Sequence, residues 1–138
     1  QENCAVCHAE DGTGLRIDGH TVFPAPWGDM SNNWGAGIVR LHTAAGFIKN
    51  NMPLGQPNSL TDQEAWDIAF YMDSQERPQD PRYTGDVKET AEKFGPTFHK
   101  HSMYGQVRES DGKLLGDHDN TGDKPFLKPD TVRSRTFD

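Results

Sequence analysis

Two cysteines followed directly by a histidine, close to the start of the chain, constrain its fold more than any other feature. Cys4 and Cys7 are the only cysteines of the 138-residue sequence, and His8 comes next. One helical turn with this spacing can form two thioether bonds to a porphyrin, and the adjacent imidazole is then placed to ligate the iron. The pattern therefore predicts one haem c, attached covalently through Cys4 and Cys7, with His8 as an axial ligand.

Other uses of this pattern fit the sequence less well. A structural zinc ribbon needs a second Cys-x-x-Cys pair, and the sequence has no further cysteine. A thioredoxin-type redox pair would follow a strand and would give His8 no role. A disulfide between Cys4 and Cys7 would close an unusually short loop. Haem attachment is therefore the hypothesis that uses all three residues.

The second axial ligand is predicted to be Met52, so that His8 and Met52 together coordinate the iron. Met52 follows a helical stretch, 44 residues after His8. Pro53 cannot continue that helix and favours an extended backbone at Met52. A thioether ligand raises the reduction potential, whereas a second histidine lowers it. The sequence leaves His99 and His101 open as alternative ligands.

A loop rich in proline and aromatic residues is predicted to surround the haem. The apolar residues expected to contact it are Phe23, Pro24, Trp27 and Pro53. A backbone carbonyl near Pro24 or Pro26 is also expected to accept a hydrogen bond from Nδ1 of His8, which would fix the orientation of the imidazole.

Hydrophobic periodicity and capping residues predict mainly helical structure. A helix is expected to end near residue 10, followed by an irregular loop over 15–33, two helical stretches within 36–50, a helix over 61–74 and a short helix over 86–94. Thr61 and Glu64 have the spacing of a capping box, and Thr43 is expected to cap the second stretch of 36–50. Met72 is expected in the core and His42 at its edge.

Composition and charge exclude some classes of partner. The net charge of −7 argues against nucleic acid and anionic membrane surfaces, which attract basic proteins. No apolar run of about 18 residues is present, so no membrane span is expected. The chain begins with Gln1 instead of Met, and we expect that something upstream has been removed. The 14 glycines and 9 prolines indicate extensive loops.

The haem motif, Met52-Pro53 in a loop and the helix at 61–74 together resemble the class I cytochrome c fold. The resemblance implies an all-α fold, with a small helical domain around one haem over residues 1–78. We expect a long, loop-rich C-terminal extension over 79–138 to wrap this domain. In that fold an N-terminal helix precedes and includes the haem motif and packs across the last helix. Because three residues precede Cys4 here, that helix is expected to be missing.

The chain also resembles the C-terminal haem domain of the dihaem thiosulfate dehydrogenases. The similar segments are residues 4–8, 22–24, 34–37, 43–49, 51–56, 60–67 and 76–82. The resemblance implies His8 and Met52 as haem ligands. It also implies an upstream domain, absent from this chain, whose haem has a cysteine as distal ligand and couples two thiosulfates to tetrathionate. Cys4 and Cys7 are both used for thioethers here, so this chain alone is not expected to be an enzyme.

These observations predict a monohaem c-type cytochrome domain that transfers one electron at a time, and the family resemblance implies a periplasmic location. Its expected partners are redox proteins, either another cytochrome or a catalytic haem domain. The alternative is that the chain is the C-terminal electron-exit domain of a dihaem thiosulfate dehydrogenase, with the catalytic haem in the absent upstream domain.

Overall fold

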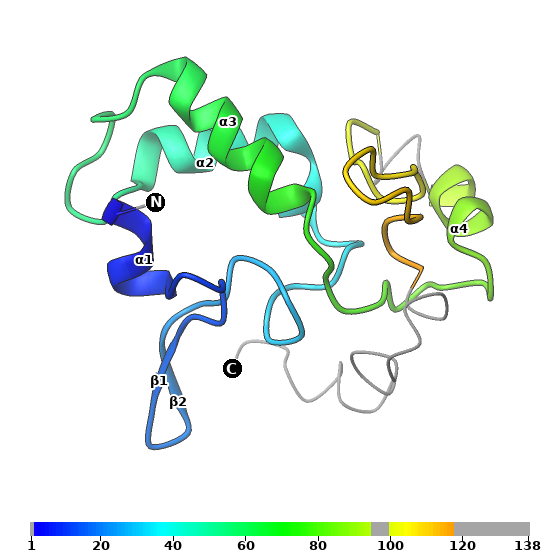
Figure 1. Cartoon of the computed structure of the whole chain (residues 1–138), viewed down its shortest axis with the longest axis horizontal. Coiled ribbons are helices and arrows are strands. Elements are labelled where there is room, and N and C mark those ends of the chain that lie inside the picture. The colour runs from blue at the N-terminus through cyan, green and yellow to red at the C-terminus, as the bar shows by residue number, and fades with distance from the viewer. Residues whose placement is uncertain (1, 95–99, 118–138) are drawn as a thin grey trace.

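Helices dominate the computed structural model, which describes residues 2–94 and 100–117 (Figure 1). The elements in these ranges are α1 (Glu2–His8), β1 (Leu15–Ile17), β2 (His20–Phe23), the short 3-10 helix η1 (Gly37–Val39), α2 (Leu41–Asn51), α3 (Asp62–Asp73) and α4 (Val87–Phe94). The helices expected at the haem motif and over 36–50, 61–74 and 86–94 are therefore confirmed. His99 and the distal part of the expected extension lie outside the described residues.

A β-hairpin replaces part of the irregular loop that the sequence predicted over 15–33, so the expectation of an all-α fold is wrong at this point. β1 and β2 pair antiparallel, with Arg16 opposite Thr21 and Ile17 opposite His20. Asp18 and Gly19 form the turn, and both have a positive φ, at 50° and 80°. An Asp-Gly pair between strands is a strong signal for a two-residue hairpin turn, so the turn could have been predicted from the sequence.

The first hydrophobic core lies between α2 and α3, which run side by side in Figure 1. Its buried members are Ala44, Ala45, Ile48, Ala65, Ala69 and Met72. The four alanines let the two helices approach closely, and Met72 fills the space that remains. Burial of Met72 confirms its predicted place in the core.

The predicted start of α3 is confirmed, whereas the predicted start of α2 is wrong. The side chain of Thr61 accepts a hydrogen bond from the backbone N–H of Glu64, and the Glu64 carboxylate accepts one from the backbone N–H of Thr61. This reciprocal pair is the predicted capping box. Thr43 lies inside α2, whose N-cap residue is Arg40.

A second core joins the chain after α4 to the region before α2. Its buried members are Trp34, Val39, Val87, Tyr104 and Leu115. The rings of Trp34 and Tyr104 stack with centroids 5.8 Å apart. The hydroxyl of Tyr104 donates to the carbonyl of Gln75 over 2.6 Å. Residues 101–117 are therefore held against the C-terminal end of α3.

A buried ion pair joins the last residue of α3 to the segment that follows this helix. Nη2 of Arg77 lies 3.2 Å from Oδ1 of Asp73, and the two residues are 1% and 0% exposed. None of the described residues forms a hydrogen bond with Oδ2 of Asp73. Burial raises the pKa of Asp73 from 3.8 to about 7, and the positive charge of Arg77 offsets only part of this increase.

This shift makes stability depend on pH in a defined direction. Between pH values of 3.8 and about 7 the folded state holds a proton on Asp73 that the unfolded state releases. The contribution of protonated Asp73 to the free energy of unfolding is therefore fully present at low pH. It is lost as the pH rises through this interval, by at most about 1.4 kcal/mol per pH unit. Urea unfolding of the wild type and of Asp73→Asn across the interval measures it. Stability curves that run parallel with pH would contradict the prediction.

Candidate haem site

Helix α1 presents the three residues of the haem motif together. Cys4 and Cys7 are free, half-buried thiols, and His8 is the last residue of the helix. Cys4 and His8 are four residues apart and therefore share one face of α1. Val6, on another face, is 82% exposed. One face of α1 thus carries Cys4 and His8, and another face carries the exposed Val6.

A hydrogen bond to the backbone fixes the imidazole of His8. Its Nδ1 lies 2.7 Å from the carbonyl oxygen of Pro24. Because a carbonyl only accepts hydrogen bonds, Nδ1 carries the proton and Nε2 remains as the nitrogen that can ligate a metal. The predicted contact with a carbonyl near Pro24 or Pro26 is confirmed, and Pro24 provides it. The ring of Phe23 meets the imidazole edge-on, with centroids 6.4 Å apart.

Two glycines that follow α1 allow the loop to approach His8 and Pro24 closely. Gly12 and Gly14 both have a positive φ, at 72° and 73°. A Cβ on Gly14 would lie 2.6 Å from the carbonyl oxygen of Phe23, and one on Gly12 would lie 2.1 Å from the ring of Trp27. The missing side chains therefore let the loop after α1 pass closely against residues 23–27. The Gly-x-Gly spacing was the signal available in the sequence.

Trp27 connects this loop to the helical core. Its ring packs edge-on against Tyr71 of α3, with centroids 5.5 Å apart, and it contacts the core between α2 and α3. The neighbouring Gly28 donates its backbone N–H to the carbonyl of Glu76 over 2.8 Å. The segment that holds Pro24 is thus anchored to the end of α3.

Met52 is the C-cap residue of α2, and its backbone has the extended conformation that the sequence predicted. Its φ and ψ are −119° and 145°, and its N–H still donates to the carbonyl of Ile48. The side chain is half-buried and packs against the core between α2 and α3. Pro53, also half-buried, turns the chain away from the helix.

His42 and His101 lie near the N-terminal end of α2, whereas Met52 lies at its C-terminal end. His42 is the second residue of α2, so it lies about 15 Å along the helix axis from Met52 at a rise of about 1.5 Å per residue. The ring of His101 contacts the ring of His42, with centroids 5.3 Å apart. His42 is exposed, which corrects its expected place at the edge of the core. This placement disfavours His101 as a substitute for Met52.

The donor set suits a covalently bound haem. Two thiols on one helical turn, an imidazole with Nε2 left for the metal, and a half-buried thioether are the groups that haem c uses. Among the described residues, no cluster of three or more His, Cys, Asp or Glu side chains could hold a metal ion without a porphyrin. The residues present therefore fit haem c better than a metal ion bound by side chains alone.

Comparison with known proteins agrees with this chemistry. The family model described as cytochrome c oxidase, cbb3-type, subunit III matches residues 1–72. The chain is 51% identical over 117 residues to thiosulfate dehydrogenase from Thiomonas intermedia, which covers 85% of this chain and 36% of the relative. It is 50% identical over 118 residues to thiosulfate dehydrogenase from Stutzerimonas stutzeri, covering 83% and 37%.

A solved structure extends the likeness to the fold. Thiosulfate dehydrogenase TsdBA from Marichromatium purpuratum, in its "as isolated" form, superposes with a TM-score of 0.75 at 50% identity. The likeness covers 84% of this chain and 24% of that one. The chain therefore spans about a third of the length of the two curated relatives and about a quarter of the solved chain.

The fold and these matches define a c-type cytochrome domain, and such domains bind haem c covalently. Within that class, the chain belongs to the family of cytochrome c oxidase cbb3-type subunit III. The described residues include no helix with the length and apolar character needed to cross a membrane.

Proposed function

We propose that this domain transfers single electrons through a haem c that is attached to Cys4 and Cys7 and ligated by His8 and Met52. The observation that carries the proposal is the hydrogen bond from Nδ1 of His8 to Pro24, at 2.7 Å. It holds the imidazole in the tautomer that keeps Nε2 for iron.

The residues of the chain bind, orient and shield the cofactor. Cys4 and Cys7 hold it covalently, and the backbone of Pro24 keeps His8 from rotating. Met52 would supply the second protein ligand to the iron. When bound, the haem supplies an iron that alternates between the ferric and ferrous states. Ligation by both His8 and Met52 would leave no open position for a substrate, which favours electron transfer over catalysis at this haem.

The other side chains predicted to contact the haem would enclose it. Phe23, Trp27 and Pro53 are half-buried, and they come from the segments that carry Pro24 and Met52. We propose that these three side chains, together with exposed Pro24, exclude water from the porphyrin. Lower polarity around the iron is one of the means by which a protein tunes its potential.

Exposed apolar side chains around the motif support a redox protein as partner. Val6, Phe47 and Leu54 are 82%, 47% and 72% exposed. They belong to α1, to α2 and to the loop after Pro53, which are the segments that supply the haem-binding residues. Exposed apolar side chains on a chain with a net charge of −7 suit a partner that combines apolar contacts with basic residues.

The domain organisation that we propose keeps residues 1–78 as the haem domain and 79–138 as an extension that wraps it. The hydrogen bond from Tyr104 to Gln75 and the stacking of Tyr104 on Trp34 support the wrapping. A second candidate function is the electron-exit domain of a periplasmic thiosulfate dehydrogenase. Two observations favour this second function: the similar proteins are thiosulfate dehydrogenases, and this chain spans about a third of their length.

A spectroscopic titration of the haem-loaded protein tests the proposal. We expect a single one-electron couple, and we expect carbon monoxide to leave the spectrum of the reduced protein unchanged because both axial positions are filled. Thiosulfate added to the oxidised chain alone should not reduce it. Rapid binding of carbon monoxide would overturn the electron-carrier assignment, and reduction by thiosulfate would place catalysis in this domain.

A further inference from the structure

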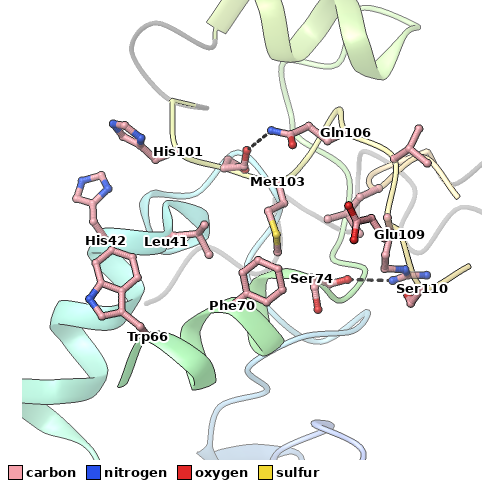
Figure 2. Close-up of a pocket in the computed structure, with 14 residues that line it drawn as sticks. Leu41, His42, Trp66, Phe70, Ser74, His101, Met103, Gln106, Glu109 and Ser110 are labelled. Carbon is pink, nitrogen blue, oxygen red and sulfur yellow. Dashed lines mark hydrogen bonds between the residues drawn. The ribbon is translucent and has the colours of Figure 1, made fainter. Parts of the chain in front are cut away.

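An open groove lies on the side of the α2–α3 pair away from α1. It has a volume of about 1050 Å³ and is lined by the start of α2, by one face of α3 and by the segment after α4. The side chains that matter here are His42, Trp66, Phe70, His101, Met103 and Glu109. Figure 2 shows the two imidazoles next to each other at one end of the groove, with Glu109 toward the other end.

The two imidazoles are close enough to share a ligand. The ring centroids of His42 and His101 are 5.3 Å apart and the ring planes are almost perpendicular, at 89°. Both residues are exposed, so an ion in solution can reach them. Neither takes part in the proposed haem ligation, since His8 and Met52 fill that role.

The backbone holds His101 in this place. Its carbonyl oxygen accepts a hydrogen bond from the N–H of Leu41 over 3.1 Å, so it satisfies one of the free donors at the start of α2. His101 has a φ of 67°, a left-handed conformation that few non-glycine residues adopt. The next residue, Ser102, is buried and accepts a hydrogen bond from the N–H of Tyr104. The neighbourhood of the two histidines is therefore fixed by the fold.

We propose that His42 and His101 bind one divalent transition-metal ion, of the zinc, copper or nickel class. A metal–nitrogen bond of about 2.0–2.1 Å and a tetrahedral angle place the centres of two ligating imidazoles roughly 5 Å apart. The observed 5.3 Å meets this requirement. Imidazole is the side chain that these metals favour, and the acidic chain attracts cations.

The site has two protein ligands, and water completes the coordination. Among the described residues no third His, Cys, Asp or Glu joins the pair. The ion would connect the start of α2 to the segment 101–117. Because the pairing of the two histidines exists in the folded chain, the ion would stabilise that segment, by an amount that rises with the logarithm of the ion concentration once this exceeds the dissociation constant.

Calorimetric titration of the haem-loaded protein with Zn²⁺ alone tests this proposal. We expect about one ion per chain, and we expect His42→Ala and His101→Ala each to weaken binding about ten-fold or more. The matched control is His20→Ala, which removes an exposed histidine from β2 and should leave binding unchanged. Circular dichroism checks that each variant is folded.

Two results would overturn the proposal. One is the absence of Zn²⁺ binding to the wild type, and the other is equal binding by the wild type and the two variants. Zn²⁺ binding is measured without electron transfer, so its outcome is independent of the proposed haem function.

Discussion

Met52→Ala is expected to remove the thioether ligand and to lower the reduction potential of the haem-loaded protein. Loss of the sulfur-to-iron interaction should abolish the weak near-infrared band of the oxidised protein, and carbon monoxide should then bind the reduced form. The potential should fall by a few tenths of a volt, because axial ligation sets haem potentials over a range of about 0.8 V. Optical spectra and a redox titration measure all three effects.

The matched control is Met103→Ala, which removes another half-buried methionine, located in the groove beyond α2. It should leave the spectrum and the potential unchanged. An unaltered near-infrared band in Met52→Ala would rule out Met52 as the ligand. The same loss in both variants would mean that methionine removal acts through the fold and not through the iron.

Arg77→Met is expected to destabilise the protein by about 3–5 kcal/mol, because it leaves the carboxylate of Asp73 buried without its partner. Both residues are almost completely buried, and in the part of the chain that the structure describes Oδ2 of Asp73 already lacks a hydrogen-bond partner. Since burial raises the pKa of Asp73 to about 7, the loss should be larger above this pH than below it. Urea unfolding on both sides of pH 7 measures the difference.

A double variant separates charge from packing. Asp73→Leu combined with Arg77→Met removes both charges and keeps apolar volume, so it should recover most of the stability lost in Arg77→Met. The two variants differ only at residue 73. If the double variant were as unstable as Arg77→Met, the packing of the Arg77 side chain would account for the loss, and the buried charge would not.

Features that depend on neighbouring residues could be predicted from the sequence. The capping box of Thr61 and Glu64, the helix around the haem motif and the extended backbone of Met52 each depend on a few consecutive residues. The hairpin at Asp18-Gly19 was equally local. It was missed because the prolines that follow it suggested an irregular loop over the whole stretch.

Features that depend on distant residues could not be predicted in this way. The sequence places Asp73 and Arg77 four residues apart, but it cannot show that they pair in a buried environment or that Tyr104 packs near them. The contact of His42 with His101 requires the segment after α4 to return to the start of α2. No local pattern specifies such a return, because it depends on the packing of Trp34 against Tyr104.

The attachment of residues 101–117 to the end of α3 also affects the order of events during folding. The hydrogen bonds from Tyr104 to Gln75, from Arg108 to Ser74 and from Gly116 to Glu76 join residues 29, 34 and 40 positions apart. Closing such long loops costs chain entropy before the contacts contribute, so we expect them to form after α2 and α3 have paired. Contacts made after the transition state slow unfolding more than they speed folding. The segment therefore determines mainly how long the folded chain persists.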